Sequence, residues 1–222
     1  TAAGILTSPY WVFKLLKTGR YRRGLKERVG LSYPLLRKMD SRPVWFHAVS
    51  VGETVAIKPL VMEFKQRHPS LDMIVSTVTE TGRQMVLDKL SEVHSTIYFP
   101  LDFSPCVRRS LAVLRPRLFA MVETEIWPNF LRLTYEQGIP ALILNGRISP
   151  HSFRRYKKIS FFMKEIFKYL EAAAMQSQDD ASRIMELGCP EGKVLVTGNL
   201  KFDLSITPKE VLIDKFEPLK AQ

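Results

Sequence analysis

Cysteine and histidine are both scarce in this sequence of 222 residues. The two cysteines, Cys106 and Cys189, are too few for a disulfide framework and form no metal-binding pattern, so they fit a reducing compartment. The four histidines are scattered singly along the chain (His47, His68, His94 and His151). The sequence therefore predicts structural roles for the histidines, and it predicts no metal site.

Several motifs that identify common enzyme classes are also missing. No G-x-G-x-x-G follows the first predicted strand, and neither G-x-x-x-x-G-K-[ST] nor G-x-S-x-G occurs in the chain. These absences argue against a dehydrogenase and a P-loop nucleotidase, and the nucleophile elbow of the serine hydrolases is missing. The apolar run near the start is well short of the ~20 residues that a full membrane span needs.

Acidic residues are outnumbered, 22 against 33 Lys and Arg, and the basic excess is concentrated in two blocks. Residues 1–46 contain ten basic and two acidic residues, and residues 147–170 contain seven basic residues and one acidic residue. Such blocks fit a polyanionic partner, namely nucleic acid, anionic lipid or a phosphorylated ligand. A solvated basic face is the alternative interpretation of either block.

The first basic block begins with an aromatic and apolar stretch, "TAAGILTSPYWVFKLL", that contains Trp11. Arg20, Arg22 and Arg23 follow it directly. Apolar and aromatic residues beside a basic cluster are typical of a segment that lies on an anionic membrane surface. We therefore assign residues 1–42 to a membrane-associating segment, while an ordinary helix packed on the domain remains the alternative.

From residue 43 onward, short apolar runs alternate with amphipathic helical patterns. This alternation predicts an α/β fold, a doubly wound parallel sheet with helices on both faces. The runs "MIVSTV", "RLFAMV" and "PALIL" are apolar throughout, which is typical of strands buried on both sides. The predicted strands are Val44–Val49, Met73–Val78, Thr96–Phe99, Leu118–Val122, Ala141–Leu144, Ala172–Met175 and Val194–Val196.

Polar loops directly follow the predicted strands, and the carboxyl ends of parallel strands meet at the ligand-binding edge of such a sheet. Glu53, Glu123 and Lys201 are the candidates for chemistry on these loops. A first-turn helix acid that merely complements the helix dipole is the alternative role for Glu53. The loops also supply candidate substrate-binding residues, which are Ser50, Gly52, Thr79, Gly82, Glu125, Asn129, Arg147 and Asn199.

Four of these segments occur together in one enzyme family. "HAVSVGE", "ETEIWPN", "NGRIS" and "GNLKFD" follow one another in this order, and the chain resembles the bacterial 3-deoxy-D-manno-octulosonic acid (Kdo) transferases over almost its whole length. The resemblance implies the amino-terminal, Rossmann-like domain of a GT-B glycosyltransferase. It implies inverting transfer of Kdo from CMP-Kdo to a lipid A precursor in lipopolysaccharide synthesis, with no cofactor and no metal ion.

The same resemblance implies roles for three residues. Glu53 matches the catalytic base, and Glu123 and Lys201 match the residues that stabilise the transition state. A base at a helix N-terminus needs burial or a nearby like charge, because the helix dipole otherwise lowers its pKa. Glu123 or Glu125 is expected to supply that charge.

The resemblance also implies partners for the basic blocks. The lipid A precursor and the anionic lipids at the cytoplasmic face of the inner membrane would meet residues 1–42. A second contact is expected at Arg154, Arg155, Lys157 and Lys158, which precede "ISFFMKEIF". No nucleic acid partner is expected, because the basic blocks contain no RRM, KH or helix-turn-helix signature.

The expected domain organisation follows from these assignments. Residues 43–204 form the acceptor-binding domain, residues 205–222 form an interdomain linker, and the carboxyl-terminal donor-binding domain is absent. The chain is then expected to bind acceptor and membrane, and to be inactive alone. A non-catalytic Rossmann domain that binds a membrane surface or a partner is the alternative function.

Overall fold

The computed structural model describes residues 24–203, and its centre is a seven-stranded parallel sheet with strand order β3-β2-β1-β4-β5-β6-β7. This confirms the predicted doubly wound architecture. Every predicted strand is present, and its ends differ from the prediction by two residues at most. The strands are β1 (Val44–His47), β2 (Met73–Thr77), β3 (Ser95–Tyr98), β4 (Leu118–Val122), β5 (Ala141–Gly146), β6 (Ala172–Met175) and β7 (Val194–Val196).

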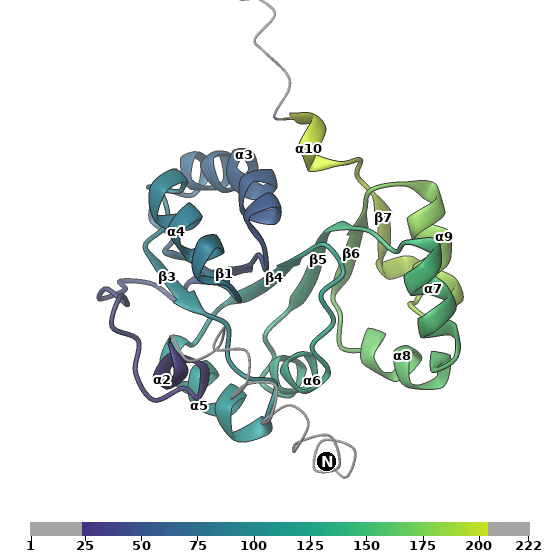
Figure 1. Cartoon of the computed structure of the whole chain (residues 1–222), viewed down its shortest axis with the longest axis horizontal. Coiled ribbons are helices and arrows are strands. Elements are labelled where there is room, and N and C mark those ends of the chain that lie inside the picture. Colours follow the sequence, from purple (N-terminus) through teal and green to yellow (C-terminus); the bar gives the residue numbers. More distant parts are fainter. Residues whose placement is uncertain (1–23, 204–222) are drawn as a thin grey trace, which may run out of the picture.

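Helices connect the strands and cover both faces of the sheet (Figure 1). Helices α3 and α4 lie on one face, and α5, α6 and α8 lie on the other. The helices are α2 (Leu25–Arg28), α3 (Val51–Arg67), α4 (Glu80–Lys89), α5 (Ser104–Leu114), α6 (Pro128–Glu136), α7 (Pro150–Lys157), α8 (Ser160–Phe167), α9 (Gln178–Glu186) and α10 (Leu200–Asp203), with a 3-10 turn at Glu191–Lys193.

The alternation of side chains along β1 divides the core into two layers. Trp45 points into the larger layer, where its ring contacts the rings of Phe119 and Phe130 edge to face. Val44 and Phe46 point into the smaller layer under α3 and α4. Burial of whole apolar side chains, worth about 1.5–3 kcal/mol each, is the main stabilising contribution on both faces.

One prediction about the sheet was wrong. The "PALIL" run was expected to be buried on both sides, but Leu142 and Leu144 of β5 are only half-buried, and Leu195 of β7 is 59% exposed. The physical reason is incomplete cover, because α3 and α4 lie over β1–β3, and within residues 24–203 only the single turn of α10 extends toward β5 on that face.

Helix α2 lies against the edge strand β3. Glu27 and Arg28 of α2 are both buried, and the Glu27 carboxylate accepts hydrogen bonds from the Tyr98 N–H at 2.8 Å and from the Arg83 guanidinium at 3.0 Å. The guanidinium groups of Arg28 and Arg83 each lie 4.4 Å from the centre of the Tyr98 ring. These contacts tie the first described helix to the sheet.

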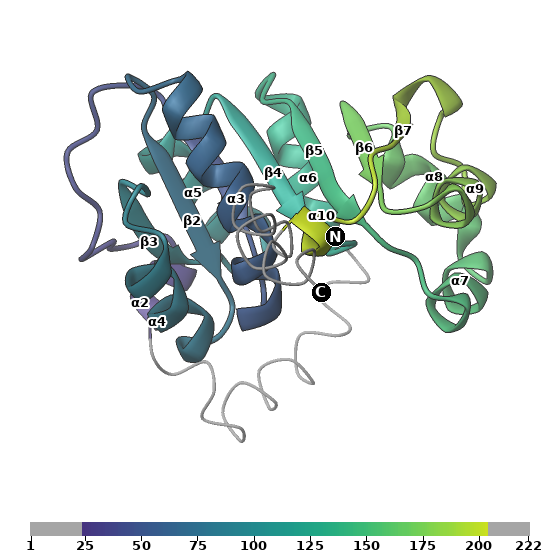
Figure 2. The ribbon, with the colours of Figure 1, turned by 90° about the horizontal axis from the view of Figure 1, so that it is seen from above.

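The carboxyl ends of the strands all face the same way, as the view from above in Figure 2 shows. The sequential order of strands reverses between β1 and β4, and ligands of open α/β sheets bind at such a reversal. Glu53 follows β1 and Glu123 follows β4. The fold thus brings the two predicted catalytic acids to the two sides of one crevice.

Candidate functional site

Glu53 lies in the first turn of α3 and forms a variant of the capping box with Ser50, in which its carboxylate reaches the Val49 N–H instead of the Ser50 N–H. The Ser50 hydroxyl accepts from the Glu53 N–H at 3.3 Å and donates to Glu53 Oε1 at 2.8 Å, and the Val49 N–H donates to Oε2 at 2.7 Å. The Ser-x-x-Glu spacing is a capping-box signature, so the sequence already contained this signal. Both carboxylate oxygens are held, and the acid has a structural role whatever its chemistry.

Burial also changes the acidity of Glu53. The residue is 7% exposed, and this burial, with the negative charge of Glu123, raises the pKa of its carboxyl group against the opposing hydrogen bonds and the charge of Lys201. A raised pKa makes a carboxylate a stronger base. The neighbouring Gly52 is exposed, and a Cβ atom there would meet only Ser50 Oγ at 3.9 Å, so there is open space beside this turn.

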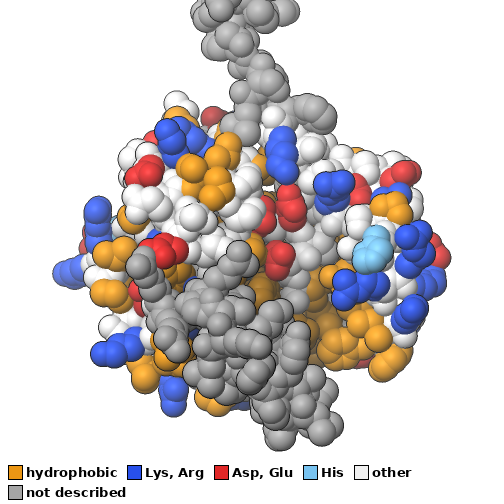
Figure 3. All heavy atoms as spheres, in the orientation of Figure 1, with side chains coloured by type: hydrophobic (Ala, Val, Ile, Leu, Met, Phe, Trp, Pro, Cys, Tyr) orange, Lys and Arg blue, Asp and Glu red, His pale blue; other side chains and the backbone are white. Residues whose placement is uncertain are grey.

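Glu123 and Lys201 meet across the crevice. The Lys201 ammonium group lies 3.3 Å from Glu123 Oε1, and both side chains are partly exposed. Glu123 has a φ of 58°, in the left-handed region that a residue with a β-carbon rarely adopts. Such strain persists mainly at functional sites. Figure 3 shows acidic side chains gathered at the centre of this face, in a hollow, with a Lys or Arg side chain beside them.

Glu125 completes a group of three acids. Burial, together with the charges of Glu53 and Glu123, raises the pKa of Glu125 to about 7. Its charge in turn contributes to a raised pKa of Tyr156 on α7, which is due first to burial. The structure therefore brings Glu53, Glu123, Glu125 and Lys201 together, and we call these four residues the acidic cluster.

Two other predicted substrate-binding residues, Thr79 and Gly82, lie at the N-terminus of α4. The Thr79 hydroxyl accepts from the Gly82 N–H at 3.1 Å and so caps α4. A Cβ atom at Gly82 would lie 2.9 Å from Thr79 Oγ1 and 3.3 Å from Thr77 Cβ, so packing explains this glycine. Asn199 lies next to Lys201, and its Oδ1 accepts from the Lys201 N–H at 3.0 Å.

Asn129 is hydrogen-bonded to Asp102, an aspartate that no sequence motif singled out. Asp102 accepts from the N–H groups of Asn129 at 3.1 Å and Phe130 at 2.7 Å, and its own carbonyl accepts from the Asn129 side chain at 2.7 Å. Burial raises the pKa of Asp102 to about 6 despite these bonds. Asp102 caps α6 and thereby holds the loop that contains Glu123 and Glu125.

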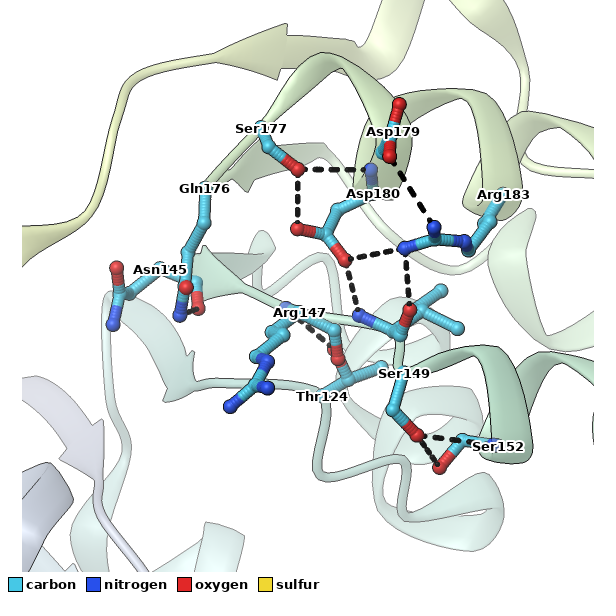
Figure 4. A network of polar contacts seen from close by, with 11 residues as sticks. Thr124, Asn145, Arg147, Ser149, Ser152, Gln176, Ser177, Asp179, Asp180 and Arg183 are labelled. Carbon is cyan, nitrogen blue, oxygen red and sulfur yellow. Dashed lines mark hydrogen bonds and ion pairs between the residues drawn. The ribbon is translucent and has the colours of Figure 1, made fainter.

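A second missed group holds the loop after β5. Asp180 accepts from the Ile148 N–H at 2.8 Å, while Arg183 donates to the Ile148 carbonyl at 3.1 Å (Figure 4). Arg147, a predicted binding residue, is exposed and is held through its backbone by the Thr124 hydroxyl at 3.0 Å. Figure 4 shows its guanidinium group pointing away from Asp180.

His47 has the structural role that was predicted. It is fully buried, its ring stacks on Phe99 at 3.9 Å, and Nδ1 lies 2.9 Å from the Ser76 hydroxyl. Burial lowers the pKa of His47 to about 3, so the ring is neutral at physiological pH. No group of three metal-ligating side chains is found within residues 24–203.

The second basic block forms α7 and α8. The side chains of Arg154, Arg155, Lys157 and Lys158 are all exposed. Phe161 is 77% exposed and Phe162 is 44% exposed on the adjoining helix. Figure 3 shows a hydrophobic patch that extends from the central acids toward this side, with basic side chains at its outer margin. The predicted contacts Trp11, Arg20, Arg22 and Arg23 lie outside the described residues.

Comparison with known proteins identifies the family. The family described as 3-Deoxy-D-manno-octulosonic-acid transferase (kdotransferase) matches residues 23–204. The chain belongs to the Kdo transferase family. Its relatives include the 3-deoxy-D-manno-octulosonic acid transferases of Haemophilus influenzae, 33% identical over 92% of this chain, and Chlamydia pneumoniae, 33% identical over 90%.

The chain spans about half the length of these curated Kdo transferases, 47% and 46% respectively. Among solved structures it is similar to the UDP-GlcNAc 2-epimerase of Neisseria meningitidis, with a TM-score of 0.51 and 16% identity over 79% of this chain and 54% of that chain. The Rickettsia bellii epimerase is similar at a TM-score of 0.53 and 10% identity, over 79% and 47%. These likenesses support the fold alone, one Rossmann-like half of a GT-B architecture.

Proposed function

We propose that this chain is the acceptor-binding half of an enzyme that transfers Kdo from CMP-Kdo to a lipid A precursor. The observation that carries the proposal is the ion pair between Lys201 and Glu123 beside the buried Glu53. Three family motifs, far apart in sequence, supply these residues to one crevice of a Kdo transferase family member.

Glu53 is the general base of the proposed reaction. An acceptor hydroxyl is a poor nucleophile, and Glu53 takes its proton as the oxygen attacks the anomeric carbon of Kdo. The raised pKa favours this role, since the dipole of α3 alone would weaken the base. General base catalysis contributes typically ~10²–10⁴-fold to the rate. Attack on the face opposite the CMP group inverts the anomeric centre.

Lys201 and Glu123 act on the charges that develop during transfer. The Lys201 ammonium group stabilises the negative charge of the departing CMP phosphate. Glu123 holds Lys201 through the ion pair and faces the positive character at the anomeric carbon. The proposed mechanism uses no metal ion.

The basic and aromatic surface of α7 and α8 is proposed to rest on the cytoplasmic face of the inner membrane. Each exposed Arg or Lys near an anionic surface contributes about 1 kcal/mol, and Phe161 and Phe162 can enter the lipid interface. Helices within residues 24–203 are all too short or too polar to cross a bilayer. In this arrangement a membrane-borne acceptor reaches the acidic cluster from the same side.

The test replaces Glu53 by Gln in the full-length protein that carries this chain and measures Kdo transfer from CMP-Kdo to lipid A precursor. Gln preserves the capping box, so the fold should be retained. We expect transfer to fall by at least ~10²-fold. Glu63→Gln, at an exposed site of the same helix, is the matched control and should leave transfer unchanged. Undiminished transfer by Glu53→Gln would remove the proposed base.

A non-catalytic role is the second candidate, because both Glu53 oxygens are already used in the capping box. In that case the chain would serve as a membrane- or partner-binding Rossmann domain. Binding to anionic vesicles would then be retained, and transfer would be undetectable in the wild-type protein under the same assay.

A further inference from the structure

The ends of β4 and β5 share an unusual backbone conformation. Register pairs Val122 with Leu144, so Glu123 and Asn145 are the next residues on the two neighbouring strands, and the Glu123 N–H donates to the Leu144 carbonyl at 2.9 Å. Their φ angles are 58° and 54°, and both lie in the left-handed region. Asn adopts this region far more readily than most residues, which gives a local reason for its presence.

The Asn145 side chain holds the start of α10. Its Oδ1 atom accepts a hydrogen bond from the Leu200 N–H at 3.0 Å, and this backbone donor fixes which end of the amide is oxygen. The Asn145 carbonyl accepts from Gln176 Nε2 at 3.0 Å, so the residue is anchored on its other side as well. Figure 4 shows the side chain pointing away from the Asp180 network. Asn145 thereby fixes the residue that directly precedes Lys201.

The nitrogen end of the same amide is a hydrogen-bond donor without a partner among the described residues. Asn145 is 2% exposed, and within residues 24–203 its Nδ2 atom is buried and has no hydrogen-bond partner. Leaving a buried donor unsatisfied is costly, so native proteins give such groups a protein, water or ligand partner. The atom lies on the side chain that contacts α10, next to the strand end that carries Glu123.

We propose that Asn145 is a positioning and sugar-binding residue of the site: Oδ1 clamps α10 so that Lys201 faces Glu123, and Nδ2 donates a hydrogen bond to an oxygen of the sugar bound there. The proposal deepens the proposed function, on which its sugar-binding arm rests. The hydrogen bond between Asn145 and Leu200 does not depend on the proposed function and is tested separately.

Two substitutions separate the two ends of the amide. Asn145→Gly removes the whole side chain and retains a backbone that accepts positive φ. Asn145→Asp retains an oxygen for the Leu200 N–H and removes the Nδ2 donor. The second variant also adds a negative charge beside the acidic cluster, which would shift the pH dependence of transfer. The loss of a donor would lower transfer at every pH.

The clamp is tested without any transfer assay, by amide hydrogen exchange at Leu200 in 15N-leucine-labelled full-length protein. We expect exchange to accelerate about tenfold in Asn145→Gly and to stay near the wild-type rate in Asn145→Asp. Unchanged exchange in Asn145→Gly would overturn the clamp.

The sugar-binding arm is tested by Kdo transfer over pH 6–9. We expect both variants to lower transfer about tenfold or more at all pH values. A wild-type rate in Asn145→Asp, or a loss that disappears on changing pH, would overturn the donor role. If wild-type protein transfers no Kdo, the proposed function fails and the sugar-binding arm falls with it, while the exchange result still decides the clamp.

Discussion

The Lys201 ammonium group lies 3.3 Å from the Glu123 carboxylate, although 78 residues separate them in the sequence. The pair joins the end of β4 to α10, and the side chains are 46% and 30% exposed. Exposed ion pairs contribute only about 0–1 kcal/mol to folding. The pair therefore matters chiefly because it places a cation beside three carboxylates.

Replacing Lys201 by Met should separate catalysis from stability. We expect Kdo transfer to fall by ~10²-fold or more, because the charge on the leaving phosphate loses its partner. The free energy of unfolding should change by less than about 1 kcal/mol. Transfer assays and urea unfolding measure the two effects. Arg67→Met breaks an exposed pair with Glu63 on α3 and should change neither; an equal loss of transfer in both variants would contradict the assignment.

The left-handed backbone of Glu123 should lower the stability of the fold at any residue with a β-carbon. Glu123→Ala and Glu123→Gly both remove the carboxylate, but only glycine relieves the steric strain at a φ of 58°. We expect the glycine variant to be about 1 kcal/mol more stable than the alanine variant, and both to lose transfer. Thermal unfolding of the two variants side by side measures this difference. Equal stabilities would show that no strain is stored there.

The raised pKa of Glu125 should make stability depend on pH. The group titrates at about 7 in the folded protein against an ordinary 4.5, so the folded state holds the proton more tightly. The resulting stabilisation is complete below about pH 4.5 and is lost as the pH rises through 7. Glu125→Gln is always neutral, and its stability relative to wild type should increase by about 1–2 kcal/mol from pH 5 to pH 8.

Urea unfolding at pH 5, 6, 7 and 8 tests this dependence. Glu165→Gln, at an exposed position paired with Lys168, is the control and should keep the wild-type profile. If the Glu125→Gln profile runs parallel to the wild-type profile, neither burial nor the charges of Glu53 and Glu123 raise the pKa of Glu125.

Asp102 should act at a distance through the cap of α6. Asp102→Ala leaves the N–H groups of Asn129 and Phe130 without their acceptor and should cost about 1–2 kcal/mol of folding free energy. Transfer should fall as well, because the loop that carries Glu123 and Glu125 is released. Asp102→Asn, which keeps one acceptor oxygen, should recover part of both losses. Recovery of stability without recovery of transfer would require direct chemistry by Asp102.

Neutralising the α7 basic residues should weaken membrane binding. With Arg154, Arg155, Lys157 and Lys158 all changed to Gln, we expect binding to anionic vesicles to fall by roughly 10³-fold, because each charge contributes about 1 kcal/mol. Vesicle co-sedimentation measures the change. Changing Arg108 and Arg109 of α5 to Gln controls for lost charge in general. Unchanged binding by the fourfold variant would count against this surface.

The strands and their order of appearance could be predicted because buried parallel strands are short, apolar and separated by helical patterns. The convergence of Glu53, Glu123 and Lys201 could also be predicted, since each follows a strand in the same direction. The spacing of Ser50 and Glu53 contained a capping box that could have been identified as well.

Asp102 and Asn145 could not be recognised in the same way. The role of Asp102 depends on where α6 lies relative to the loop after β3, and no local pattern records that relation. Asn145 depends on a backbone angle and on the approach of Leu200 from 55 residues away. The half-burial of Leu142 and Leu144 likewise depends on how far α3 and α4 extend over the sheet, and an apolar run alone does not show this.

The incompletely covered face of β5–β7 should affect the solubility of the purified polypeptide. Leu142, Leu144 and the 59% exposed Leu195 form an apolar strip beside β7, which is an edge strand of the sheet within residues 24–203. Exposed apolar strips beside an edge strand promote aggregation at high protein concentration. The 222-residue polypeptide, purified by itself, should therefore be monodisperse only when dilute or in mild detergent.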